Sequence, residues 1–216
     1  MNGPWANPWQ PNYYPQGNPN GYVPFQPFVP PPQPYWNRAY APPDPANYRS
    51  KKYPDLNPIL AADTTLLRFD VKKKPRTEIL ASTYYSSRHS PALSKGVKHL
   101  RLISKSFPWT IDIVSQGPIT CEAVWDALFT GLQEFIADSE WGFIIDDKKK
   151  REAVEKAAKK RIEGEQITDK RLRRIDYLGE GTFFKGLEQD QDYHKLRLLP
   201  AEQGCPETWI VKLGTQ

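Results

Sequence analysis

Cysteine, histidine and long apolar runs are scarce in this 216-residue sequence, and each scarcity argues against a class of protein. Cys121 and Cys205 are too few for a secreted disulfide framework or a cysteine zinc site, although a single bond between them stays open. The three histidines, His89, His99 and His194, share no metal-ligand spacing. The sequence therefore predicts no bound metal and no cofactor.

Segments with the length and hydropathy of a membrane span are also missing. The longest apolar run beside a helical pattern, residues 141–145, is far shorter than the ~20 residues that a membrane-spanning helix needs. The N-terminus lacks the basic and then apolar pattern of an export signal. We therefore expect an intracellular protein, cytoplasmic or nuclear, without membrane contact.

Catalytic signatures are absent as well. The sequence contains no nucleophile-elbow pattern and no phosphate-binding P-loop. The glycines of Gly179-Glu180-Gly181 lack the spacing of a dinucleotide site and indicate a hairpin turn instead. We predict no catalytic residue, and an enzyme of an unrecognised type stays as an alternative.

Charged side chains are nearly absent from residues 1–47, where Arg38 and Asp44 are the only ones. The same stretch holds 14 of the 22 prolines. Proline fixes φ and removes a backbone donor, so neither a helix nor a central strand is expected there. We predict a disordered tail over residues 1–53, followed by one folded domain over residues 54–216.

The tail has the features of a docking segment. Proline recurs at every third position from Pro24 to Pro30, which matches the three residues per turn of polyproline II. Segments of this kind bind aromatic-lined grooves of adaptor domains. The tail holds more aromatic residues than a passive spacer requires, and a tail that is merely soluble and extended stays an equal alternative. The predicted docking residues are Pro24, Phe25, Pro27, Phe28, Pro30, Pro34 and Tyr35.

The pattern beyond the tail predicts an α+β domain with a mostly antiparallel sheet of about five to seven strands. A long loop over residues 77–97, with a short strand near Ile79, is expected between the first two strands. No alternation of strand and helix favours a doubly wound fold. The predicted strands are residues 66–71, 99–103, 110–114, 173–178, 182–187, 195–199 and 209–213.

Two consecutive helices are predicted within this domain. The first, over residues 121–138, begins at the capping residue Thr120 and carries one broad apolar face. The second, over residues 148–164, has a thin apolar face and is expected on the surface.

Five segments follow one another in a recognisable order: Leu56–Leu60, Leu67–Val71, Phe107–Ile113, the helix start at Ile119-Thr120, and Arg173–Leu178 with Phe184–Leu187. Together they resemble a domain of unknown function that is abundant in mushroom-forming fungi. The resemblance covers about residues 54–200. It implies a proline- and tyrosine-rich tail before the domain, and it implies no activity, ligand or site residue.

The positive charge of the protein belongs to one segment. Residues 148–174 carry 12 lysines and arginines against five acids, a local charge of +7. Such a segment favours nuclear import or phosphate contact with nucleic acid, but interspersed acids are also typical of a solvated helix. The predicted basic patch is Lys148, Lys149, Lys150, Arg151, Lys159, Lys160, Arg161, Arg173 and Arg174.

These features favour a non-enzymatic protein–protein interaction module, with the folded domain as the recognition part and the tail as a tether. The alternative is a nucleic-acid-associated nuclear protein that uses residues 148–174. A groove edged by Trp109 or Trp125 would indicate a peptide ligand, such as the protein's own tail. The sequence identifies neither the protein partner nor the oligomeric state.

Overall fold

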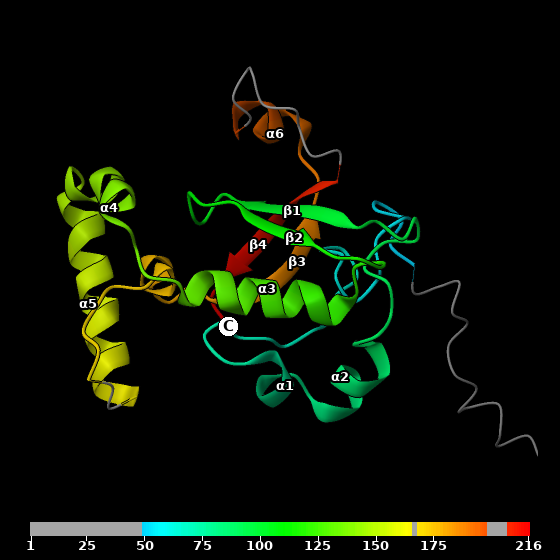
Figure 1. Ribbon diagram of the computed structural model, residues 1–216, viewed down its shortest axis with the longest axis horizontal. Helices are drawn as coiled ribbons and strands as arrows, with labels where there is room; N and C mark the ends of the chain where they lie inside the picture. Colours follow the sequence, from blue (N-terminus) through cyan, green and yellow to red (C-terminus); the bar gives the residue numbers. More distant parts are fainter. Residues whose placement is uncertain (1–48, 166–167, 198–206) are drawn as a thin grey trace, which may run out of the picture. The chain divides into compact units, whose positions relative to one another are not determined.

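The computed structural model describes residues 49–165, 168–197 and 207–216 (Figure 1). The predicted disorder of the tail up to residue 48, the predicted docking residues between Pro24 and Tyr35, and Cys205 lie outside the described residues.

A four-stranded mixed sheet forms the centre of the described domain, in the order β2-β1-β4-β3. β1 (His99–Ser104) pairs antiparallel with β2 (Ile111–Val114) and parallel with β4 (Thr208–Gly214), and β3 (Phe183–Glu188) pairs antiparallel with β4. The α+β prediction is confirmed. The predicted five to seven strands are too many, because the described residues form four.

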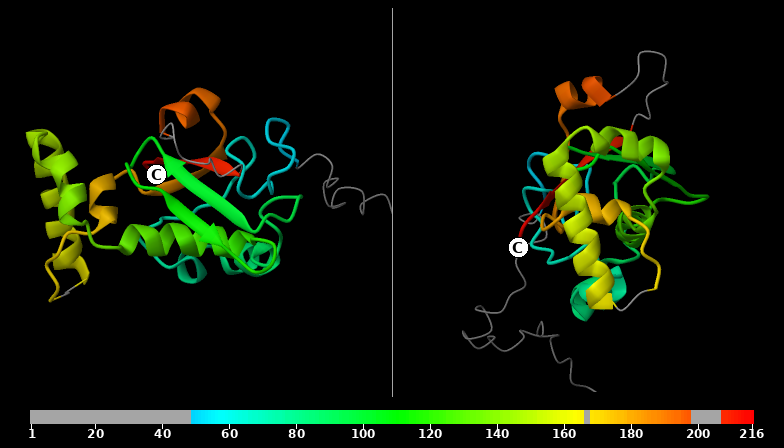
Figure 2. Two further views of the ribbon diagram at one scale, coloured as in Figure 1. Left: turned by 45° about the horizontal axis from the view of Figure 1, so that its top comes forward. Right: turned by 90° about the vertical axis from the view of Figure 1, so that its left-hand side faces the viewer.

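Helices cover both faces of the sheet. α3 (Cys121–Gln133) and α6 (Gln191–Arg197) lie on opposite sides of it (Figures 1 and 2). The main core contains Leu100 and Leu102 of β1 together with the apolar face of α3. Ile103 alternates to the other face of β1, where it pairs with Ile210 and is also buried.

α3 starts where the sequence predicts but ends earlier. The Thr120 hydroxyl accepts a hydrogen bond from the Ala123 amide (3.3 Å), which confirms the predicted cap. The predicted extension to residue 138 is wrong, because Glu134 and Ile136 exchange backbone hydrogen bonds with Arg174 and Leu172. This extended pairing stops the helix at Gln133.

Two further helices, α4 (Asp138–Ile145) and α5 (Lys148–Glu165), follow α3. The prediction for α5 is confirmed, whereas α4 was not predicted. α5 buries only Val154 and Ala158, so the thin apolar face expected from the sequence is what contacts the domain.

The predicted loop over residues 77–97 contains two short helices, and the strand expected near Ile79 is wrong. α1 (Pro75–Glu78) begins with a proline, whose fixed φ suits the first helical turn. α2 (Ala81–Ser87) follows after two residues. Both pack against α3.

Residues 173–178 form a 3₁₀ helix, η3 (Arg174–Leu178), in place of a strand. The Asp176 carboxylate accepts a hydrogen bond from the Arg173 amide, which satisfies a backbone donor at the start of the turn. The predicted hairpin around Gly179 is also wrong, because β3 pairs with β4 and not with the segment before it.

The remaining two strand predictions also fail. Residues 66–71 make one isolated bridge to β3, between Asp70 and Phe183. Residues 191–197 are helical (α6), since Asp190 accepts from the Tyr193 amide and begins a helical turn. α6 is held to the sheet by the Tyr193 hydroxyl, which donates to the Ser104 carbonyl (2.5 Å).

The contacts of the domain reach back into the predicted tail. The Ser50 hydroxyl donates to Asp63 (2.7 Å) and accepts from the Tyr53 amide. Tyr53 is only 5% exposed and packs edge-to-face on Trp209 of β4. Ser50 and Tyr53 are therefore buried in the folded domain.

Within residues 49–165, 168–197 and 207–216, no helix combines the length and the apolar character that crossing a bilayer requires.

One glycine is required by close backbone packing. Gly186 has a φ of 99° and lies in the irregular part of β3, next to the backbone of Ala62. A Cβ at Gly186 would lie 2.5 Å from the Ala62 Cα, closer than two carbon atoms can approach. The contact fixes the segment around Ala62 against the sheet edge.

We expect Gly186→Ala to lower the free energy of unfolding by more than about 2 kcal/mol, because it adds both a clash and backbone strain. The measurement is urea-induced unfolding of the full chain. Gly117→Ala is the control, since a Cβ there meets no atom within 4 Å. Equal unfolding midpoints for the two variants would contradict the requirement for glycine at position 186.

Candidate functional site

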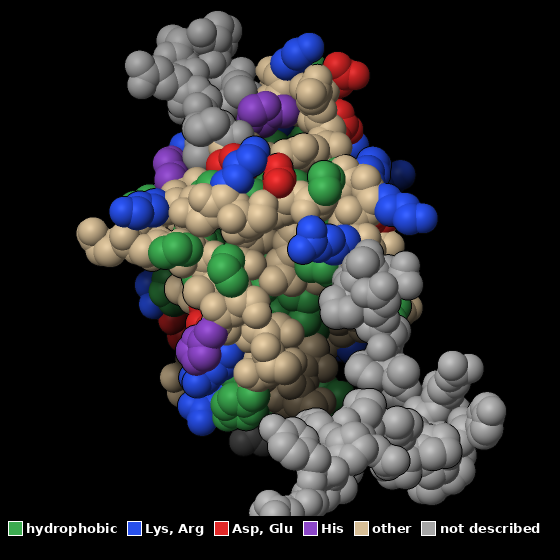
Figure 3. Space-filling view, turned by 90° about the vertical axis from the view of Figure 1, so that its right-hand side faces the viewer, with side chains coloured by type: hydrophobic (Ala, Val, Ile, Leu, Met, Phe, Trp, Pro, Cys, Tyr) green, Lys and Arg blue, Asp and Glu red, His purple; other side chains and the backbone are tan. Residues whose placement is uncertain are grey.

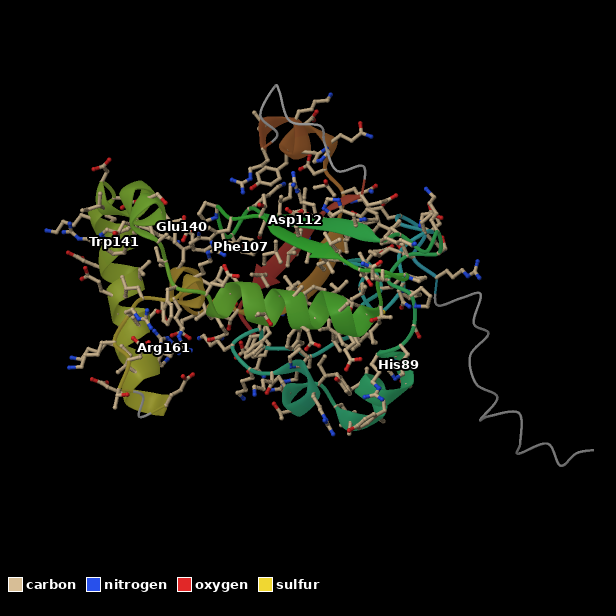
Figure 4. All side chains as sticks on the ribbon, viewed as in Figure 1. His89, Phe107, Asp112, Glu140, Trp141 and Arg161 are labelled. Carbon is tan, nitrogen blue, oxygen red and sulfur yellow. The ribbon has the colours of Figure 1, made fainter. Side chains whose placement is uncertain are left out.

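The histidines do not converge on a common site. They appear as three separate purple patches on the face shown in Figure 3. His89 lies just after α2, 4.0 Å from Glu122, whereas His99 pairs with Asp112 on β2. Figure 4 shows His89 and Asp112 well apart.

The part of the chain that the structure covers shows neither a reactive cysteine nor a cluster of metal-ligating side chains. Cys121 is fully buried, and burial raises the pKa of its thiol to about 12, so the reactive thiolate is not available near neutral pH. Among the described residues, no group of three His, Cys, Asp or Glu side chains could hold a metal ion.

The predicted basic patch divides into outward and inward side chains. Lys148, Lys159 and Lys160 are exposed, and each lies within 4.0 Å of an acidic partner: Glu152, Glu163 and Glu180. Such exposed pairs contribute little stability, about 0–1 kcal/mol each. Lys149 is exposed and Arg151 is half-buried on the same helix.

Arg161 points inward from α5 and forms the most buried ion pair of the described domain. Its Nε and Nη2 atoms each donate to an Asp176 carboxylate oxygen at 2.8 Å. The side chains of Arg161 and Asp176 are only 9% and 2% exposed. Figure 4 shows Arg161 on α5. The pair therefore joins α5 to η3.

A small pocket of about 210 Å³ lies beside this pair. Its lining has three cations and three acids, so it presents no excess of positive charge to a phosphate. The charged lining residues are Lys72, Lys160, Arg161, Glu165, Asp176 and Glu180.

Aromatic rings hold two more of the predicted basic residues. The Lys150 ammonium lies 3.6 Å from the centroid of the Tyr177 ring and donates to the Tyr177 carbonyl. Burial lowers the pKa of Lys150. Tyr177 packs edge-to-face on Trp109. The Arg174 guanidinium lies 5.3 Å from the centroid of the same Trp109 ring. This stack fixes η3 against the turn between β1 and β2.

The two C-terminal arginines of the predicted patch are also engaged. Arg174 forms ion pairs with Glu134 and Glu140. Arg173 donates to the Gln133 side chain (2.9 Å) and lies over the Phe135 ring. Four of the nine predicted basic residues, Lys150, Arg161, Arg173 and Arg174, therefore make contacts within the domain.

A hollow of about 790 Å³ lies elsewhere on the described domain. We call it the Leu66–Leu80 groove. Its volume falls within the range of small-ligand sites. Leu66 and Leu80 are 92% and 71% exposed. The apolar lining residues are Pro58, Ile59, Leu66, Leu67 and Leu80.

Local hydrogen bonds hold Leu66 outward. The Thr64 and Thr65 hydroxyls donate to the carbonyls of Pro58 (2.7 Å) and Ile59 (2.6 Å). The Leu67 amide in turn donates to the Thr65 hydroxyl (3.2 Å). Because the backbone is fixed on both sides of Leu66, its side chain cannot turn into the core without breaking these bonds.

Half of the lining residues are polar: Asn57, Thr64, Arg68, Glu78 and Thr83. Arg68 is exposed, and Glu78 forms an ion pair with Lys73 (3.0 Å). The groove thus offers apolar contact together with amide, hydroxyl and guanidinium groups, and its one carboxylate is paired with Lys73.

The groove differs from the one that the sequence analysis considered. Trp109 and Trp125 do not edge a groove, because they are only 7% and 0% exposed. Leu66 and Leu80 were missed as site residues. The signal in the sequence was the Leu66-Leu67 doublet, which breaks the alternation expected of a half-buried strand.

Comparison with known proteins identifies a family. Residues 67–193 match the model of a family of unknown function, DUF6699. The chain belongs to this family. The resemblance to an uncharacterised domain is thereby confirmed. No curated protein and no solved structure matches the chain.

The matched residues do not include the whole sheet. β4 lies beyond residue 193, yet it occupies the centre of the sheet and buries Trp209, Ile210 and Val211.

We therefore expect residues 67–193, expressed alone, to show no cooperative thermal unfolding, whereas the full chain does. A sharp calorimetric transition of the shorter chain would contradict the central role of β4.

We expect Arg161→Met to lower the free energy of unfolding by about 3–5 kcal/mol, because it leaves the buried Asp176 carboxylate without its partner. The measurement is again urea-induced unfolding. Lys159→Met is the matched control, since it removes the same charge from an exposed position of the same helix. Equal losses in the two variants would mean that net charge, and not the buried pair, determines the effect.

Proposed function

We propose that the folded domain is a non-enzymatic protein-interaction module that binds an extended apolar peptide in the Leu66–Leu80 groove. The observation that carries this proposal is the pair of exposed leucines, 92% and 71% accessible, in the lining of a hollow of about 790 Å³. Burial of two leucine side chains contributes about 3–6 kcal/mol before the costs of association.

Several features support binding over catalysis. Glu78 is the only acid that lines the groove, no histidine lines it, and the charge of Glu78 is already matched by Lys73. A general acid–base site needs at least one group poised to exchange a proton with substrate. An enzyme of an unrecognised type therefore stays an alternative without a supporting observation.

We do not extend the proposal to nucleic acid. Four of the nine predicted basic residues make contacts within the domain, and three of the outward lysines lie beside acids. A nucleic-acid interface needs several cations free to contact phosphates on one face. A protein partner, an intracellular location in cytoplasm or nucleus, and a fungal source stay predictions from the sequence.

Peptide-display selection on the full chain tests the proposed groove. We expect selected apolar peptides to bind the double variant Leu66→Asp/Leu80→Asp at least about tenfold more weakly, since a buried carboxylate without a partner is costly. Fluorescence anisotropy measures the affinity. Both leucines are exposed, so the variant is expected to unfold within about 1 kcal/mol of the wild type.

Val114→Asp provides the control. Val114 is 77% exposed on the edge strand β2 and does not line the groove. Selected peptides should bind this variant as tightly as the wild type. The proposal is overturned if the selected peptides bind all three proteins equally, or if selection yields no binding peptide.

A further inference from the structure

We propose that the Leu66–Leu80 groove binds the chain's own segment Pro24–Tyr35, so that the protein carries its own competing ligand. This inference rests on the proposed function, because it requires the groove to accept an extended apolar peptide. It adds the identity of one occupant and a form of self-regulation.

The chemistry of the segment matches that of the groove. Residues 24–35 contain Phe25, Phe28 and Tyr35 and no charged side chain, so burying them requires no charge to leave water. Their prolines carry no backbone N–H, which reduces the number of donors left unsatisfied in an apolar groove. A polyproline II segment also loses little conformational entropy on binding.

The groove can contact both the rings and the backbone of such a segment. Leu66 and Leu80 offer apolar surface to the aromatic rings. Arg68 is exposed at the same groove, and its guanidinium can stack on an aromatic ring or donate to a peptide carbonyl.

The position of the domain's first described residues favours binding within the chain. Ser50 is anchored to Asp63, and the next residue, Thr64, lines the groove. The 14 residues between Tyr35 and Ser50 can span at most about 50 Å when fully extended. The tether therefore limits the segment to within about 50 Å of Ser50.

A tether of this length makes a weak contact effective. A short flexible linker gives an effective concentration on the order of 1 mM. A contact with a Kd of about 0.1 mM would then fill the groove about 90% of the time. Removing the tethered ligand would raise the apparent affinity for a competing peptide about tenfold.

The test uses full-length chains and a fluorescein-labelled synthetic peptide with the sequence of residues 24–35. The tail variant carries Phe25→Ser, Phe28→Ser and Tyr35→Ser. We expect the peptide to bind this variant about tenfold more tightly than the wild type, because its tethered competitor is gone. Adding Leu66→Asp to the variant should abolish the gain.

A matched control removes three aromatic residues from another part of the tail. The variant Trp5→Ser/Trp9→Ser/Tyr13→Ser should bind the peptide as weakly as the wild type. The difference between the wild type and the tail variant should also persist at low protein concentration, since the competition is intramolecular. A difference that disappears on dilution would assign the occupant to a second copy and overturn the proposal.

The outcomes separate this inference from the proposed function. If peptides from the display selection bind the tail variant through Leu66 but the 24–35 peptide does not, the inference fails and the proposed function stands. If neither kind of peptide binds through Leu66, both fail. Equal binding of the 24–35 peptide to the wild type and the tail variant would also overturn self-occupancy.

Discussion

The fold depends on the parallel pairing of β1 with β4. β4 is the last strand in the sequence, yet it lies between β1 and β3 and forms hydrogen bonds on both sides. Trp209, Ile210 and Val211 are all nearly fully buried. Without β4, the β1–β2 hairpin and β3 would have no shared backbone hydrogen bonds, and their apolar faces would lose a common layer.

The groove depends on the same sheet. β3 holds the segment before Leu66 through Leu187, which exchanges backbone hydrogen bonds with Leu60 and Ala62, and through the close approach at Gly186. Thr64 and Thr65 then fold the chain back on Pro58 and Ile59. The exposure of Leu66 is thus a consequence of how the sheet edge is closed, and not of an unanchored loop.

Prediction from the sequence succeeded where one segment alone determines its structure. α3 has a capping threonine and apolar residues at three- and four-residue spacing, and β1, β2 and β4 bury regular apolar sets. The strand prediction for residues 173–178 failed because Ile175 and Tyr177 alternate as in a strand. The structure there is set instead by Asp176 and its partner Arg161 on α5. That partner is 15 residues away and invisible to a local pattern.

The same limit applies to function. A count of lysines and arginines identified residues 148–174 as basic, but the count does not distinguish an arginine in a buried ion pair from one in solvent. The exposed leucines of the groove were missed for the opposite reason, because a local pattern assigns apolar residues to the core. A single apolar residue that tertiary hydrogen bonds hold outward can be recognised only when the residues that hold it are known.

An exposed apolar groove has a cost that bears on its role. Two leucines left in water favour non-specific association, which proteins usually avoid by covering such surface. A tethered, uncharged segment can cover them reversibly, because its effective concentration is high enough for occupancy and its intrinsic affinity low enough for release. A partner then needs only a more favourable apolar contact than the tail provides. The low charge of the tail and the exposure of Leu66 and Leu80 are, on this argument, two parts of one binding equilibrium.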